Sequence, residues 1–121
     1  MTRNLIGEKL TKWKLQKGYL KTSVTLLELS KTLGINRTYL SNYVNEKYHN
    51  NFNGWVNGLR VKEAIRLMSS HKSYPLTSIA EKVGFTDLPH FSKQFKMREG
   101  VCPSVWKKTK ATSTTSKKET I

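Results

Sequence analysis

Cysteine and acidic residues are scarce in this 121-residue chain, and long apolar runs are absent. The single cysteine, Cys102, excludes a disulfide framework and a cysteine-based zinc site within one chain, and it indicates a reducing compartment. The three histidines, His49, His71 and His90, lack metal-ligand spacing, so we expect neither a metal nor a cofactor. No apolar run approaches the roughly 20 residues that span a bilayer, and no signal-peptide segment opens the chain. These absences predict a soluble, cytoplasmic protein.

The shortage of acidic residues leaves a large positive charge. Against 22 lysines and arginines stand 8 acidic residues, which gives a net charge of +14 and a pI of about 10.1. The segment 107–121 contains five lysines and one glutamate, a charge of +4, so the remaining residues carry +10. The part that folds is therefore basic in its own right, which points to nucleic acid or an anionic membrane as partner. A globular domain with a solvated lysine surface is the alternative.

Apolar spacing predicts helices along the chain and no strand. Thr25 with Glu28 three residues later forms a capping box, and Asn36 and Asp87 are suitable caps for two further helices. Gly18 is expected to end the first helix. The expected helices lie at about 4–17, 26–33, 37–47, 53–70, 75–83, 88–98 and 103–106.

An internal repeat is the most informative feature of the sequence. Residues 29–35 align with 79–85 at an offset of 50, and 40–44 align with 91–95 at an offset of 51. Each copy reads as a short helix, a glycine-containing turn and a second helix, which is the helix-turn-helix arrangement. One copy would be a weak signal, whereas two in a strongly basic chain predict an all-α, homeodomain-like protein with two helix-turn-helix subdomains.

This organisation divides the chain into four parts. They are an N-terminal helix with the first helix-turn-helix (1–51), a long linker helix (52–72), the second helix-turn-helix (73–109) and a disordered basic tail (110–121).

The second helix of each unit is expected to show a polar face. Leu40 and Val44 in the first unit, and Phe91 and Phe95 in the second, are four residues apart and should face the core. The residues turned outward are then Arg37, Thr38, Ser41, Asn42 and Asn45 in the first unit, and Leu88, Ser92, Lys93 and Lys96 in the second. Such side chains suit base edges and phosphates in a major groove; the alternative is that they are solvated or act as caps.

The linker helix is expected to set the distance between the two second helices. On one face of B-DNA they would enter major grooves roughly 34–36 Å apart. Alternatively, the DNA would bend to meet both.

Several motifs resemble the AraC/XylS family of transcription regulators, over about residues 5–108. The linker segment 53–70 is similar to that family's connecting helix through Trp55-Val56-Asn57, Leu59-Arg60-Val61, Ala64 and Leu67. The family signature is matched by Ile79-Ala80-Glu81-Lys82-Val83-Gly84-Phe85, Phe91-Ser92-Lys93-Gln94-Phe95-Lys96 and Gly100-Val101-Cys102-Pro103. The resemblance implies seven helices and an asymmetric promoter site in double-stranded DNA.

By this resemblance, bases are read from the first turns of each second helix. The implied base-reading residues are Arg37, Thr38, Ser41, Asn42, Leu88, Pro89, Ser92 and Lys93, and the implied backbone contacts are Lys47, His90 and Lys96. Two departures stand out. Leu88 and Pro89 replace polar residues, so the second unit is expected to read a thymine methyl group or to grip phosphate. Cys102 replaces a Ser or Thr, which weakens the cap of the last helix.

The resemblance also bears on partners. It implies an activator that contacts RNA polymerase, preceded by a sensing or dimerising domain. The stretch 7–20 resembles versions of the domain that end membrane-anchored or two-component hybrid sensors. The alternatives are a minimal stand-alone member and a C-terminal piece of a longer regulator, and we expect the second. Its full-length form is expected to dimerise, while the isolated domain is monomeric and makes no membrane contact.

Other functional classes fit the sequence less well. A nonspecific RNA-binding or single-strand-binding protein is the runner-up, with Tyr39, Tyr43, Tyr48 and Trp55 as candidate stacking residues. An anionic-membrane binder is disfavoured because the apolar faces are needed for packing. An enzyme is not expected, because the sequence holds no nucleophile triad, carboxylate pair or phosphate-binding glycine loop.

Overall fold

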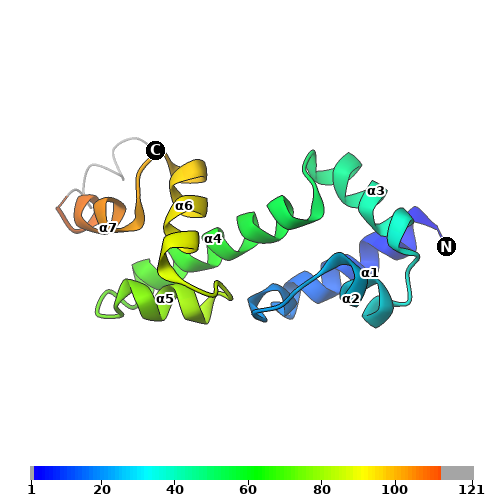
Figure 1. The fold of residues 1–121 in the computed structure, drawn as a ribbon, viewed down its shortest axis with the longest axis horizontal. Coiled ribbons are helices and arrows are strands. Elements are labelled where there is room, and N and C mark those ends of the chain that lie inside the picture. The colour runs from blue at the N-terminus through cyan, green and yellow to red at the C-terminus, as the bar shows by residue number, and fades with distance from the viewer. Residues whose placement is uncertain (1, 113–121) are drawn as a thin grey trace.

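The computed structural model describes residues 2–112, and these form seven α-helices and one 3₁₀ turn without a strand. The elements are α1 (Arg3–Leu15), η1 (Gly18–Leu20), α2 (Leu26–Leu33), α3 (Arg37–Tyr48), α4 (Phe52–Ser70), α5 (Leu76–Lys82), α6 (Leu88–Glu99) and α7 (Pro103–Thr112). The all-α class with two helix-turn-helix units is confirmed. Figure 1 shows an elongated molecule in which α4 runs between a group containing α1 to α3 and a group containing α5 to α7. None of the described helices is long and apolar enough to cross a membrane.

Helix starts follow the capping residues that the sequence predicted. The Thr25 hydroxyl accepts a hydrogen bond from the Glu28 amide at 3.1 Å, Asn36 accepts one from the Thr38 amide at 2.9 Å, and Asp87 accepts one from the His90 amide at 2.8 Å. Each bond satisfies an amide that the first turn of a helix leaves without a backbone partner. The second helix of each helix-turn-helix unit, α3 or α6, therefore begins at a fixed residue.

The end of α1 differs from the prediction. Lys17, and not Gly18, takes the left-handed conformation, with φ of 58°, and Gly18 begins η1 instead. Gly18 lies directly against the indole of Trp13, whose Nε1 occupies the space that a Cβ would need. Glycine is required here by close packing and not by backbone angle.

The C-terminal helix is longer than expected. The sequence placed the start of a disordered tail at residue 110, yet α7 continues to Thr112. The Thr109 hydroxyl donates to the Val105 carbonyl at 2.8 Å, and the Lys110 ammonium lies 5.6 Å from the centre of the Trp106 ring. These i, i+4 contacts extend the helix. The rest of the predicted tail, 113–121, lies outside the described residues.

Two hydrophobic cores share α4. Trp55, Val56 and Leu59, from the first half of α4, join a cluster built on α1, α2 and α3. Val61, Ala64 and Met68, from its second half, join a cluster built on α5 and α6. One helix thus supplies part of both cores and connects the two helix-turn-helix units.

Candidate nucleic-acid interface

One face of α3 is buried in the first core, and the opposite face is polar and exposed. Leu40 and Val44 have no exposed surface, and this fixes the rotation of the helix. The predicted reading residues then fall on the surface: Arg37, Thr38 and Asn42 are exposed, and Ser41 is half-buried. Asn45, also expected to face outward, is exposed and donates a hydrogen bond to the Ser41 carbonyl at 3.0 Å. Lys47 is exposed in the last turn.

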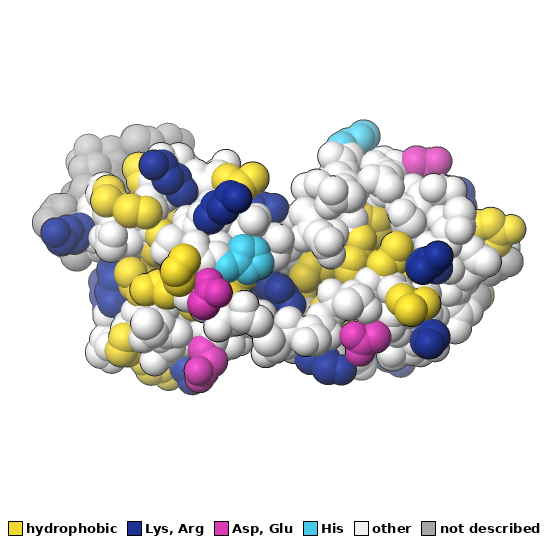
Figure 2. Space-filling view, in the orientation of Figure 1, with side chains coloured by type: hydrophobic (Ala, Val, Ile, Leu, Met, Phe, Trp, Pro, Cys, Tyr) yellow, Lys and Arg dark blue, Asp and Glu magenta, His cyan; other side chains and the backbone are white. Residues whose placement is uncertain are grey.

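The rotation of α6 is set in the same way by Phe91 and Phe95, both fully buried. Pro89, His90, Lys93 and Lys96 are exposed, and Ser92 is half-buried. Figure 2 shows Lys or Arg side chains and a histidine over this part of the molecule.

Leu88 departs from the expected outward position. It is half-buried and packs against the second core. Part of its side chain is therefore occupied by the fold, which leaves less of it for a base than the sequence suggested.

Several cations on these two helices form no ion pair with a carboxylate among residues 2–112. Across residues 2–112, the ion pairs are Arg3–Glu46, Lys17–Glu63, Lys21–Glu28 and Arg66–Glu63. Arg37, Lys47, Lys93 and Lys96 take part in none of them. Their charge is available to a polyanion outside the molecule.

A groove that the sequence did not predict adjoins α3. It encloses about 510 Å³ and is lined by Thr25, Leu26, Leu27, Arg37, Ser41, Asn51, Phe52 and Asn53. These residues bring together the first turns of α2 and α4 and the first turn of α3. Asn51 caps α4 by accepting from the Gly54 amide at 2.7 Å; its place just before the apolar run of α4 was the available signal, because Asn is a preferred cap.

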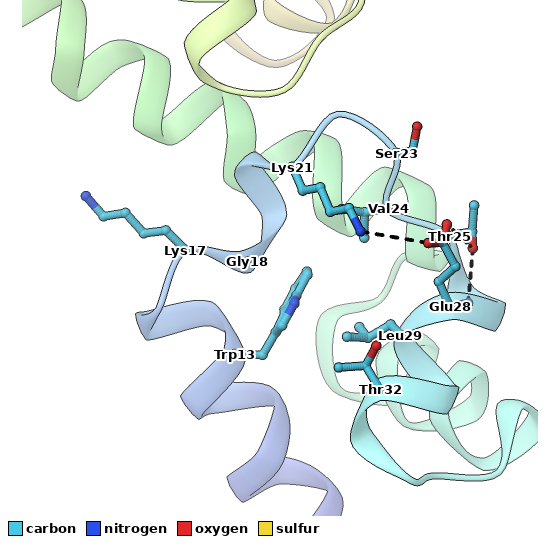
Figure 3. A pocket seen from close by; sticks show the side chains of 10 residues that line it. All are labelled: Trp13, Lys17, Gly18, Lys21, Ser23, Val24, Thr25, Glu28, Leu29 and Thr32. Carbon is cyan, nitrogen blue, oxygen red and sulfur yellow. Dashed lines mark hydrogen bonds and ion pairs between the residues drawn. The ribbon is translucent and has the colours of Figure 1, made fainter.

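A second hollow, of about 330 Å³, lies between α1, η1 and α2 (Figure 3). Trp13 and Leu29 line it, and Lys21 and Glu28 pair beside it at 3.9 Å. None of the predicted DNA-contacting residues borders this hollow. It meets the groove beside α3 at Thr25, which lines both.

The aromatic side chains considered for base stacking are mostly occupied. Tyr48 stacks on Trp55 with ring centres 4.8 Å apart, and the Arg3 guanidinium lies 5.0 Å from the centre of the Tyr43 ring. Of the four candidates, Tyr39 alone is exposed. A continuous stacking platform for single strands is therefore not present among them. Within the described residues, no group of three or more His, Cys, Asp or Glu side chains could hold a metal ion.

Comparison with known proteins gives a consistent result. Residues 29–109 match the family model described as a helix-turn-helix domain. A curated relative, the uncharacterized HTH-type transcriptional regulator YisR of Bacillus subtilis (strain 168), is 35% identical over 94 residues, which cover 78% of this chain and 32% of the relative. The chain spans about a third of the length of that relative.

Solved structures are similar over most of the chain. The C-terminal domain of AraT, a response regulator from Geobacillus stearothermophilus, superimposes with a TM-score of 0.77 at 25% identity, covering 87% of this chain and 84% of that one. The C-terminal domain of the two-component response regulator yesN from Fusobacterium nucleatum gives a TM-score of 0.72 at 25% identity, covering 84% and 97%. The DNA-binding domain of AdpA, solved in complex with a target DNA, gives 0.75 at 17% identity, covering 88% and 93%, and shares the fold.

Proposed function

Because the chain belongs to the AraC-type helix-turn-helix family of transcription regulators, we propose that it reads double-stranded DNA with α3 and α6 in successive major grooves. Sequence-specific DNA binding is the function of this domain family. One observation carries the two-helix proposal: each helix fully buries two apolar residues and presents cations that no carboxylate of the described chain neutralises. Both helices thus have the chemistry of a reading helix.

Base contacts from α3 are assigned to Arg37, Thr38, Ser41 and Asn42. An Asn side chain can pair with both N6 and N7 of adenine, and Arg with both O6 and N7 of guanine. Asn42 and Arg37 are exposed, so both are able to make these two-bond contacts. Thr38 and Ser41 add single hydrogen bonds.

Base contacts from α6 are assigned to Leu88, Pro89, Ser92 and Lys93. Lys93 suits guanine, and Ser92 suits several bases. Pro89 and the exposed part of Leu88 suit a thymine methyl group. This helix therefore has fewer hydrogen-bonding side chains toward bases than α3, and we propose that its contribution to specificity is the smaller one.

Backbone contacts are assigned to Lys47, His90 and Lys96, and to the groove beside α3. The first turns of α2 and α4 meet there with Arg37. Amide groups at helix starts and a guanidinium favour an anion. A phosphate oxygen of the strand that flanks the first major groove is the ligand that fits this chemistry.

The remaining assignments concern the whole protein. We propose that the domain acts in the cytoplasm as part of a longer activator that contacts RNA polymerase, that it has no catalytic activity, and that the isolated chain is monomeric. The response-regulator origin of two similar structures supports the view that such domains serve signalling proteins.

The experiment that tests this function is selection from a random duplex library at near-physiological salt, where nonspecific phosphate attraction is weakened. Two enriched blocks, centred about one helical turn apart, are the expected result. A single enriched block would show that α6 does not read bases. Stronger binding to single-stranded DNA or RNA of equal length would refute duplex reading altogether.

A further inference from the structure

A buried arginine on α4 contacts both helix-turn-helix units. Arg60 is 7% exposed. Its Nε donates to the Tyr19 carbonyl at 2.8 Å, and its Nη2 donates to the Lys21 carbonyl at 2.7 Å. Both carbonyls lie in the segment that connects α1 to α2 in the first unit. The same guanidinium lies 5.6 Å from the ring centre of Phe85, in the turn of the second unit.

The turn of the second unit also lies directly against the first unit. A Cβ on Gly84 would come within 2.8 Å of the Leu20 carbonyl oxygen and 2.9 Å of Arg60 Nε. Leu20 packs against both cores. The two units therefore touch through backbone and a buried side chain, and are joined by more than the linker helix.

A second arginine ties the reading helix α6 to the start of α4. The Nη2 of Arg98 donates to the Gly54 carbonyl at 2.8 Å, and its Nη1 donates to Gln94 Oε1 at 2.7 Å. Gly54 lies in the first turn of α4, beside Phe52 and Trp55 of the first core. Arg98 thus fixes α6 against the part of α4 that packs on α3.

We propose that Arg60 and Arg98 are positioning residues that hold α3 and α6 at one separation, so that the domain accepts one spacing between the two blocks of its DNA site. The proposal rests on the two-helix function above. One added base pair moves the second block about 3.4 Å along the helix axis and rotates it by about 35°. If the two reading helices are held rigidly, one of them loses its contacts with DNA after such a shift. If they are loosely joined, the second helix can move with its block and keep its contacts.

The first test measures dissociation constants on duplexes that carry both selected blocks at the best spacing and at spacings one and two base pairs shorter or longer. For the unaltered chain we expect affinity to fall about tenfold or more away from the best spacing. Arg60→Met keeps the length of the side chain but removes its donors. We expect Arg60→Met to reduce the loss of affinity away from the best spacing (the spacing penalty) to about threefold, with unchanged base preference inside each block.

Arg66→Met is the matched control. Arg66 lies on the same helix, its side chain is 53% exposed, and its bonds go to Glu63 within that helix. We expect the spacing penalty of this variant to equal that of the unaltered chain. If Arg60→Met weakens binding equally at every spacing, the residue has only a stabilising role and the proposal is overturned. If selection yields one block, it is the two-helix function that fails.

A second test requires no DNA. Spin labels at Lys31→Cys on α2 and Glu99→Cys on α6, in a Cys102→Ser background, report the distance between the two units. A single narrow distance distribution is expected, and it should broaden in Arg60→Met and in Arg98→Met but not in Arg66→Met. Circular dichroism establishes whether each variant is folded. If Arg60→Met does not fold, Arg98→Met provides the test. Equal widths in all folded variants would overturn the proposal.

Discussion

The lysines and arginines include some that bond to other parts of the protein and some that are exposed for contact with a partner. Lys9 donates to the Leu33 carbonyl at 2.6 Å, Lys107 donates to the Tyr74 carbonyl at 2.9 Å, and Arg60 is buried. These cations hold helices together. Lys93 and Lys96 have no such bonds among the described residues and are exposed on α6. Only part of the net charge of +14 is therefore carried by side chains that are exposed for direct contact with a partner.

Asn42 and Lys93 should determine sequence preference at particular positions. Replacing either with alanine removes a hydrogen-bonding group from a base edge. We expect Asn42→Ala or Lys93→Ala to cost about 1–3 kcal/mol on the selected site and to relax preference at one or two base pairs. Binding to a set of single-base variants of the site measures this. Lys62→Ala, at an exposed position of α4, is the control, and an unchanged preference in Asn42→Ala would contradict our assignment of α3.

Lys96 should act through phosphate alone. Lys96→Ala is expected to weaken binding to all sequences alike and to lower the slope of log K against log salt by about one, because one fewer counterion is released. Titrations at several salt concentrations, on selected and unrelated duplexes, measure both quantities. A change confined to the selected duplex would instead indicate a base contact.

At the scale of single elements, local bonds decide where helices start and how they are held. Caps fix the first turns of α3 and α6. Glu63 holds α4 to the turn between α1 and η1: its carboxylate accepts from Arg66 at 2.7 and 2.9 Å and from Lys17 at 3.1 Å. The hydrogen bonds from Arg66 are the main cause that lowers the pKa of the Glu63 carboxyl below its usual value.

Glu63 should make stability depend on acid pH. Because its pKa is lower in the folded state, its contribution to the free energy of unfolding is present above the unfolded pKa of about 4.3 and is lost as pH falls through the folded value. We expect Glu63→Gln to be less stable than the unaltered chain near neutral pH, by about 1–3 kcal/mol. The difference should shrink below pH 4. Urea unfolding at a series of pH values measures it, and a constant difference from pH 3 to 7 would contradict the assignment.

Asp87 should stabilise α6 through its cap. Asp87→Ala removes the acceptor of the His90 amide and is expected to lower the free energy of unfolding by about 1 kcal/mol. Asp87→Asn keeps an acceptor at the same place and should lose much less. Thermal unfolding of the three proteins compares them. Equal losses in both variants would show that charge, and not the cap, is what matters.

At the scale of the whole molecule, α4, Leu20 and Arg60 couple two cores that would otherwise be separate. Figure 1 shows α4 running between the two groups of helices. Each group is small, and a small unit buries too little surface to be very stable alone. Coupling through α4 should therefore make the two units fold together.

This coupling predicts one cooperative unfolding transition. Trp106→Phe leaves tryptophan only at positions 13 and 55, which belong to the first core. Fluorescence then reports the first core, whereas far-ultraviolet circular dichroism reports all helices. We expect the two denaturation curves of this variant to coincide. Separate midpoints would show that the cores unfold independently.

The sequence by itself determined the order of the helices, the caps at Thr25, Asn36 and Asp87, and the double helix-turn-helix plan. Apolar spacing and capping are local: Thr25 and Glu28, or Asp87 and His90, lie three residues apart and act wherever the chain folds. The outward positions of Arg37, Asn42 and Lys93 followed from the same spacing, because Leu40 and Phe91 had to be inside.

Tertiary structure decided what distant segments do to one another. The half-burial of Leu88, the packing of Gly18 on Trp13, the groove between α2, α3 and α4, and the position of Arg60 all depend on contacts between elements. Arg60 and Tyr19 are 41 residues apart, and no periodicity in the sequence relates them. An arginine in an amphipathic helix is ordinarily a solvated residue; only the folded arrangement of carbonyls around Arg60 places it between the two helix-turn-helix units.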